Sequence, residues 1–161
     1  GSNLDDPAAQ VRAGAQALGK LPGTRLVRCS SLYRTAPVGI TEQPDFINAV
    51  CAVDTGLPAA TLMQALLDIE RAHGRQRDIS GGPRTLDLDL LLYGDQVCHE
   101  PGLTLPHPRL HERAFVLYPL SEIAPGLSIP GRGQVEILRA GCAGQAIERL
   151  AERIYDTDEH R

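Results

Sequence analysis

Apolar residues recur with helical spacing in two stretches of the chain. The first follows Asp6-Pro7, a pair typical of a helix start, because Asp caps free N–H groups and Pro fits the first turn. Gly19 is typical of a helix end, and Pro58 opens the second stretch. The residues expected on the inner faces are Val11, Ala15 and Leu18 in the first helix and Leu62, Leu66 and Ile69 in the second.

Other segments alternate apolar and polar residues, as β-strands do. Residues 25–35 and 46–53 show this pattern and predict strands joined by a loop rich in proline. On the first strand one face would carry Val27, Cys29, Ser31 and Tyr33. Gly94-Asp95 predicts a tight turn into a strand at 96–99. Further helices are expected near 109–122 and 143–154.

The acidic segment, residues 85–93, sets two carboxylates into an apolar run. In a strand, Asp87 and Asp89 would stand on one face with Cα atoms roughly 6.5–7 Å apart. Two such carboxylates repel each other and lose solvation, so a cation between them is favourable. Because oxygen-only ligands suit Mg²⁺, the pattern predicts a magnesium site. The alternative is a solvent-facing strand, which is disfavoured because Asp is uncommon in strands.

The cations of the chain are almost all arginine, with Lys20 the single lysine. A genome rich in G and C would produce the same bias, so the positions matter more than the count. Four arginines fall within residues 71–84, just before the acidic segment. The planar guanidinium suits phosphate oxygens, so this loop is expected to meet an anion near the metal.

The composition bounds the class of protein. With 161 residues, 42% hydrophobic and 22% charged, we expect one globular domain spanning 1–161. No apolar run approaches the ~20 residues of a membrane span, and no signal peptide opens the sequence. A net charge of −4 argues against a nucleic-acid partner. Four scattered cysteines without a C-x-x-C pair predict reduced thiols in a cytoplasmic protein, which we expect to be a monomer.

The order of elements indicates the fold class. The chain reads α-β-β-α-β-β followed by helices, and a parallel crossover helix normally has a strand on each side. One strand before residue 1 would complete β-α-β-β-α-β. We therefore expect an α+β fold: a ferredoxin-like βαββαβ core with an added hairpin strand and C-terminal helices, its first strand missing from this sequence.

Six motifs occur in the order and spacing of one enzyme family. The chain resembles the 6-hydroxymethyl-7,8-dihydropterin pyrophosphokinases of folate biosynthesis over roughly residues 1–125. In that family the first motif directly follows the first strand, which favours a missing strand over a cloning remnant at Gly1-Ser2. The motifs are G-S-N-L at 1–4, S-S-L-Y-R-T at 30–35, Q-P-D-F-I-N-A at 43–49, G-P-R-T-L-D-L-D at 82–89, L-P-H-P-R at 105–109 and R-A-F-V-L-Y-P-L at 113–120.

The resemblance implies transfer of pyrophosphate from ATP to the hydroxymethyl group of the pterin, with release of AMP. It implies that Asp87 and Asp89 bind two Mg²⁺ ions and that Arg75 and Arg84 act on the phosphates during transfer. An arginine at a phosphoryl transition state is worth about 10³–10⁵ in rate. The ATP contacts that it implies are Arg77, Arg84, Leu90, Thr104, His107 and Arg113.

A pterin needs a flat apolar slot with hydrogen-bonding groups at its edge. Phe46 and Phe115 are the only phenylalanines, and both fall where the family places the rings that sandwich the pterin. By themselves they would be interpreted as core residues. The amide of Asn48 supplies a donor and an acceptor for the pterin edge. Thr35 and Val38 are expected to line the same pocket.

Three other interpretations are open. His107 and His111 have the i, i+4 spacing of a helical zinc pair, although Pro108 lies between them and no third ligand is evident. Another Mg²⁺-dependent phosphoryl or nucleotidyl transferase on a ferredoxin-like fold would also use paired aspartates. A non-catalytic ferredoxin-like binding module would leave the aspartates and Arg84 without a role.

Overall fold

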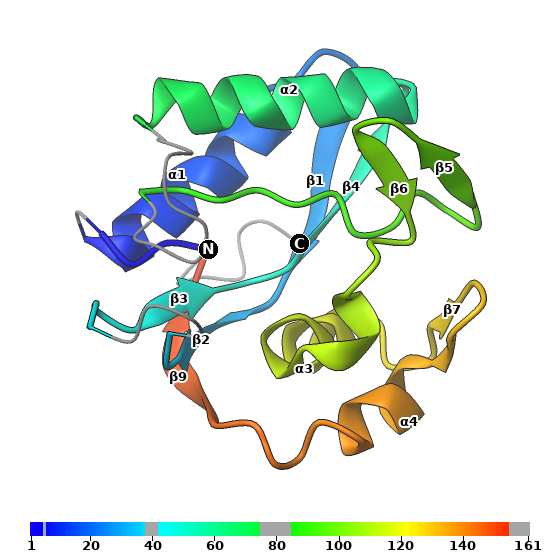
Figure 1. Ribbon diagram of the computed structural model, residues 1–161. Coiled ribbons are helices and arrows are strands. Elements are labelled where there is room, and N and C mark those ends of the chain that lie inside the picture. The colour runs from blue at the N-terminus through cyan, green and yellow to red at the C-terminus, as the bar shows by residue number, and fades with distance from the viewer. Residues whose placement is uncertain (5, 38–41, 75–84, 155–161) are drawn as a thin grey trace.

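The computed structural model describes residues 1–4, 6–37, 42–74 and 85–154, and it mixes helices with short antiparallel sheets (Figure 1). This confirms the α+β class. The helices within these ranges are α1 (Pro7–Gly19), α2 (Ala59–Ala72), α3 (Ala114–Ile123) and α4 (Val135–Ala140), with a 3₁₀ turn, η1 (Leu110–Glu112). The strands are β1 (Thr24–Cys29), β2 (Ser31–Thr35), β3 (Phe46–Asn48), β4 (Cys51–Thr55), β5 (Cys98–Glu100), β6 (Leu103–Leu105), β7 (Ser128–Ile129), β8 (Gly133–Gln134) and β9 (Ile147–Arg153).

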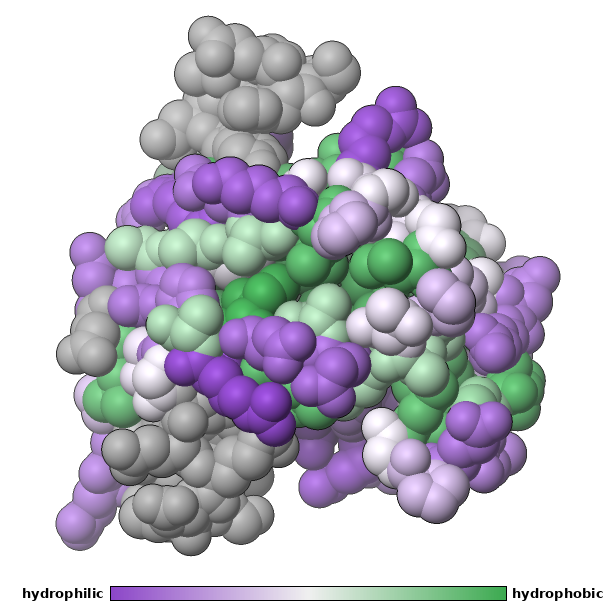
Figure 2. All heavy atoms as spheres, turned by 90° about the horizontal axis from the view of Figure 1, so that it is seen from above, coloured by the Kyte–Doolittle hydropathy of each residue, from purple (hydrophilic) through white to green (hydrophobic). Residues whose placement is uncertain are grey.

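The first two helices form where the sequence predicts them. The Asp6 carboxylate caps α1 by accepting a 3.4 Å hydrogen bond from the N–H of Ala9. Along α2, Leu62 and Leu66 are buried. Figure 2 views the molecule from above, which is the side on which α2 lies in Figure 1. Hydrophilic and apolar residues alternate over the surface seen there. Both helices therefore bury one face and expose the other.

Each of the two long strands predicted from the sequence is split in two. Residues 25–35 form β1 and β2, broken at Ser30, and residues 46–53 fall into β3 and β4. β1 pairs with β4, whereas β2 lies between β3 and β9. The chain thus passes from one small sheet to another at a joint. There the N–H of Ser30 donates to the Val50 carbonyl at 2.9 Å, and the Val50 N–H donates to Ser30 Oγ at 3.0 Å.

The prediction that Val27 shares a face with Ser31 and Tyr33 is wrong. Val27 is 44% exposed, whereas Ser31 and Tyr33 are buried. The register of β1 against β4 shifts between Leu26 and Arg28, so a bulge reverses the alternation of side chains there.

Four other predictions are corrected. Residues 85–93 are extended but belong to no strand, and the strand after the Gly94 turn begins at Cys98 and pairs with β6. The helix expected over 109–122 is interrupted at Arg113, between η1 and α3. The segment expected as a helix over 143–154 contains β9 instead, because its backbone bonds to the free edge of β2.

The buried apolar residues within the described ranges form three clusters. The largest surrounds α3, where Leu110 and Leu117 are fully buried. A second joins α1 to β2 and β3, and a third joins α2 to β6. None of the helices described is long and apolar enough to cross a bilayer.

Candidate functional site

The acidic segment crosses the molecule below α2 in Figure 1 and is held by single contacts rather than by a ladder. Gly1 and Asp87 exchange two backbone hydrogen bonds: the Gly1 ammonium donates to the Asp87 carbonyl at 2.7 Å, and the Asp87 N–H donates to the Gly1 carbonyl at 2.8 Å. Farther along, the N–H of His107 donates to the Leu91 carbonyl at 2.8 Å. The first motif and the L-P-H-P-R motif therefore both fix this segment.

Glu70 is a buried carboxylate that sequence reasoning missed. It lies on α2, is 1% exposed, and accepts a 2.7 Å hydrogen bond from the N–H of Leu88, the residue between the two aspartates. The signal was present in the sequence, since Glu70 continues the i, i+4 row of Leu62 and Leu66 on the inner face of the helix. A carboxylate in that row must meet a polar partner inside the protein.

Asp87 and Asp89 lie near two groups from the later motifs, His107 and Arg113. Burial lowers the pKa of His107, Arg113 and Arg109 lower it further, and the negative charges of Asp89 and Asp87 oppose the shift. Burial and the neighbouring Arg109 likewise lower the pKa of Arg113, against the pull of Asp89 and Asp87. The sequence separates these four groups by up to 26 positions, and the fold gathers them within electrostatic reach of one another.

A cavity of about 570 Å³ adjoins the aspartates. It lies between β4 and the acidic segment and is walled by parts of α1, α2 and α3. Most of its lining is apolar, and the lining includes four of the predicted site residues, Asp87, Asp89, Asn48 and Phe115. The cavity therefore joins the predicted metal residues to two of the predicted pterin residues.

The residues predicted to hold the pterin come mainly from β2 and β3. The amide Nδ2 of Asn48 donates to Thr35 Oγ1 at 3.1 Å, and Phe46 lies opposite Thr35 in the strand pair. Phe115 is partly buried against the α3 cluster. The Arg113 guanidinium lies over the Phe115 ring, 5.3 Å from its centroid, so a residue predicted to contact ATP touches a residue predicted to contact the pterin.

Gly1 is a second residue that sequence reasoning passed over. A Cβ on Gly1 would overlap Oδ1 of Asn48, so any larger residue would displace the Asn48 amide from this position. Ser2 follows with two backbone hydrogen bonds to Ile47, and Asn3 Nδ2 donates to the Pro44 carbonyl at 3.0 Å. The G-S-N-L motif thus positions β3 and the turn that precedes it.

Two predicted ATP contacts lie on other parts of the fold, and further predicted residues fall outside the described ranges. Thr104 lies on β6 opposite His99, whereas Leu90 lines the cavity and also packs with the apolar cluster of Leu103 and Leu105. The predicted residues that fall outside the described ranges are Val38, Arg75, Arg77 and Arg84.

Within the described ranges, no third ligand for a zinc ion lies with His107 and His111. His111 lies in η1 with a buried Nδ1 that has no hydrogen-bond partner. Across the described ranges, His, Cys, Asp and Glu side chains form no group of three or more that could share a metal ion. A metal at the aspartates would therefore draw its other ligands from bound substrate, water or residues beyond those ranges.

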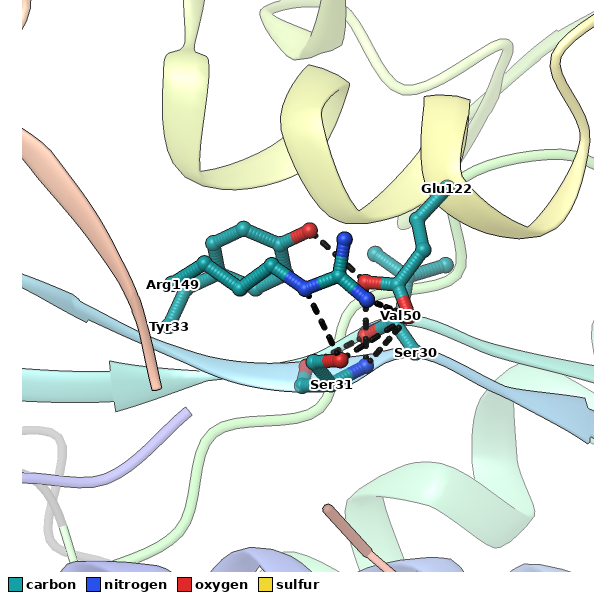
Figure 3. A network of polar contacts seen from close by, with 6 residues as sticks. All are labelled: Ser30, Ser31, Tyr33, Val50, Glu122 and Arg149. Atoms are coloured by element: carbon teal, nitrogen blue, oxygen red, sulfur yellow. Dashed lines mark hydrogen bonds and ion pairs between the residues drawn. The ribbon is translucent and has the colours of Figure 1, made fainter. Parts of the chain in front are cut away.

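A polar network joins the strand and the helix that carry the predicted pterin residues (Figure 3). Glu122, on α3, accepts hydrogen bonds from Tyr33 Oη at 2.7 Å, from the Ser31 N–H at 3.0 Å and from Ser31 Oγ at 3.0 Å. Arg149 of β9 lies 3.4 Å from the same carboxylate. Burial and the negative charge of Glu122 raise the pKa of Tyr33, so the phenol stays protonated and donates.

Comparisons with known proteins match this chain to one enzyme family. The 7,8-dihydro-6-hydroxymethylpterin-pyrophosphokinase (HPPK) model matches residues 1–125. A 2-amino-4-hydroxy-6-hydroxymethyldihydropteridine pyrophosphokinase of Pseudomonas aeruginosa is 48% identical over 150 residues, 93% of either chain. The Haemophilus influenzae protein of that name is 45% identical over 130 residues, 81% of either chain.

A longer relative carries the same unit. The folic acid synthesis protein fol1 of Schizosaccharomyces pombe is 41% identical over 130 residues, which are 81% of this chain and 18% of that protein. The match of the family model to most of the chain and the identity to bacterial relatives along nearly their whole length agree. The chain belongs to the 7,8-dihydro-6-hydroxymethylpterin-pyrophosphokinase family.

Proposed function

We propose that this protein transfers the pyrophosphoryl group of ATP to the hydroxymethyl group of 6-hydroxymethyl-7,8-dihydropterin in folate biosynthesis. One observation carries the proposal: in a chain of this family, two aspartates share one cavity with Asn48 and Phe115. The cavity thus offers an acidic side for metal-bound phosphates and a side with a ring and an amide for the pterin.

The carboxylates of Asp87 and Asp89 fit magnesium. Both supply hard oxygen donors, Asp89 is exposed to incoming ligands, and the backbone of Asp87 is held by Gly1. We assign two Mg²⁺ ions to this pair. When bound, the ions would neutralise phosphate charge and orient the phosphates of ATP.

His107 and Arg113 are the proposed phosphate contacts that the structure describes beside the aspartates. The Arg109 N–H lies 3.3 Å from His107 Nδ1, which therefore acts as acceptor. The lowered pKa favours the neutral ring, so its proton is on Nε2 and can be donated to a phosphate oxygen. Arg75 and Arg84 are proposed to act on the phosphates during transfer, and Arg77, Leu90 and Thr104 to complete the ATP site.

The pterin is proposed to lie between Phe46 and Phe115. Asn48 and Thr35 already share a hydrogen bond, which orients the Asn48 amide for the edge of the ring. Val38 is proposed to line the same slot. In the reaction, the hydroxymethyl oxygen forms a bond to the β-phosphorus and its proton is released to solvent. The bond from that phosphorus to the oxygen of the α-phosphate breaks, and AMP leaves. The residues described here act by holding these atoms in line.

The described sheets are proposed to be parts of one ferredoxin-like βαββαβ core with an added hairpin strand and C-terminal helices. Among the described residues, β4 pairs only with β1, and the acidic segment bonds to single residues rather than to a strand. In such a core, β4 and the acidic segment would belong to a single sheet.

Analysis of the nucleotide products tests the proposed reaction. The protein is incubated with ATP and Mg²⁺, with and without 6-hydroxymethyl-7,8-dihydropterin, and the nucleotides are separated by chromatography. Pterin-dependent AMP is the expected result. Pterin-dependent ADP would contradict the proposal by indicating transfer of a single phosphoryl group.

A further inference from the structure

Two cysteines face each other at the joint between the two small sheets. Cys29, the last residue of β1, is opposite Cys51, the first residue of β4. The adjacent pair, Ser30 and Val50, is linked by a backbone hydrogen bond, so Cys29 and Cys51 form a non-hydrogen-bonded pair. The Cα atoms of such a pair are roughly 4.5 Å apart, within the range of about 4.4–6.8 Å that disulfides accept.

The two thiols differ in character. Both are free and partly exposed in the structure. A hydrogen bond from Cys51 lowers the pKa of Cys29, with burial opposing the shift, whereas the same contact and burial raise the pKa of Cys51. Because the thiolate is the reactive form, this difference supports Cys29 as the first nucleophile of the pair.

We propose that Cys29 and Cys51 are a redox-active pair that a small-molecule disulfide, such as oxidised glutathione, converts to a cross-strand disulfide. The Cys29 thiolate attacks one sulfur of the oxidant, which forms a mixed disulfide and releases one glutathione thiolate. Cys51 loses its proton to solvent and attacks the Cys29 sulfur, which releases the second glutathione thiolate. The protein loses two electrons and two protons, and the oxidant becomes two reduced thiols.

The position of the pair gives the bridge a structural consequence. Cys51 lines the cavity and follows Asn48 by three residues, while Ser30 leads directly into β2. A bridge would close the joint covalently beside the strands that carry Thr35 and Asn48. It would also close a loop that includes β2 and β3, which restricts the unfolded chain. Oxidation is therefore expected to shift the denaturant midpoint upward.

Thiol counting tests the pair without reference to the proposed reaction. Protein incubated with oxidised glutathione is denatured and its free thiols are titrated, then its peptides are mapped without reduction. The expected count falls from four to two, with a linked peptide that joins Cys29 to Cys51, and reductant restores four. Four remaining thiols, or a bridge to Cys98 or Cys142, would overturn the proposal.

Three variants assign the order of the steps. Cys51→Ser is expected to stop at a mixed disulfide on Cys29, whereas Cys29→Ser leaves Cys51 largely unmodified. Cys98→Ser, on β5, is the matched control and is expected to form the same bridge as the unaltered protein. Modification of Cys51 in Cys29→Ser at the rate seen for Cys29 would overturn the assignment of Cys29 as the nucleophile. Because every readout is chemical, failure here leaves the proposed activity untouched.

Discussion

Glu122 accepts a 2.7 Å hydrogen bond from the hydroxyl of Tyr33, which ties α3 to β2. Phe115 lies about two helical turns before Glu122, so both side chains are on one face of α3. Thr35 is two residues after Tyr33, on the same face of β2. The contact therefore sets the distance between the helix that carries Phe115 and the strand that carries Thr35.

Glu122→Gln is expected to weaken the pterin site selectively. Glutamine keeps the shape of the side chain but loses the negative charge that accepts hydrogen bonds from Tyr33, Ser31 and Arg149. Loss of one charge-assisted hydrogen bond, about 1.5–3 kcal/mol, corresponds to a rise of roughly ten- to hundredfold in the KM for the pterin. The KM for ATP should change less than the KM for the pterin.

Glu148→Gln is the matched control for that variant. Its exposed carboxylate lies 2.8 Å from Arg34 on the neighbouring strand, so its loss should leave both KM values near those of the unaltered protein. Equal increases for ATP and pterin in Glu122→Gln would indicate a general loss of structure and would contradict a positioning role.

Tyr33 should make stability fall at alkaline pH. Its pKa is raised above 10.0 by burial, by the hydrogen bond to Glu122 and by that residue's charge. Above pH 10 the unfolded chain therefore releases this proton while the folded protein keeps it, and the free energy of unfolding decreases as pH rises. Denaturant unfolding across this range should show a steeper fall for the unaltered protein than for Tyr33→Phe. Parallel curves would show that Tyr33 titrates normally in the folded protein.

Asp89→Asn should keep the fold and lower turnover at least about a hundredfold, since it removes an anionic ligand from the proposed metal pair. The side chain is exposed, so little stability should be lost. Turnover is measured over a range of Mg²⁺ concentrations, with Asp95→Asn in the following turn as the control. An unchanged rate at every Mg²⁺ concentration would exclude the metal role.

Phe115→Leu should weaken pterin binding more than ATP binding. Leucine fills part of the space next to the α3 cluster but cannot stack, and the stacking term is about 0.5–1.5 kcal/mol, roughly two- to tenfold in affinity. Tyr118→Leu, on the same helix and outside the cavity lining, is the control. Calorimetry that found equal losses for pterin and for a non-hydrolysable ATP analogue would argue against the sandwich.

Local signals in the sequence were sufficient to predict elements whose contacts are between residues close in the sequence. The Asp6 cap and the i, i+4 rows predicted α1 and α2, and the Gly94 turn was also predicted. The prediction of a helix over 143–154 is wrong. Ile147, Leu150 and Ile154 have helical spacing, so the local pattern favours a helix there. That stretch pairs with β2 instead, a contact more than a hundred residues away in sequence that no local pattern encodes.

In the candidate site, too, some residues could be predicted from the sequence and others are revealed only by the fold. The aspartates and phenylalanines were predicted from their residue types and motifs. Glu70 and Gly1 were missed, although Glu70 contacts the residue between the two aspartates and Gly1 approaches Asn48. Glu70 acts on the backbone of Leu88, and Gly1 acts through having no side chain. Their roles depend on partners 18 and 47 positions away, which only the folded chain reveals.

Phosphorus NMR of the pterin product tests the central claim most directly. The unaltered protein and Asp89→Asn, matched for folding, are mixed with ATP, Mg²⁺ and 6-hydroxymethyl-7,8-dihydropterin. The unaltered protein is expected to form AMP and a pterin that carries two coupled phosphorus atoms. The variant is expected to form much less of this product. A pterin that carries a single phosphorus, or equal product from both proteins, would contradict the central claim.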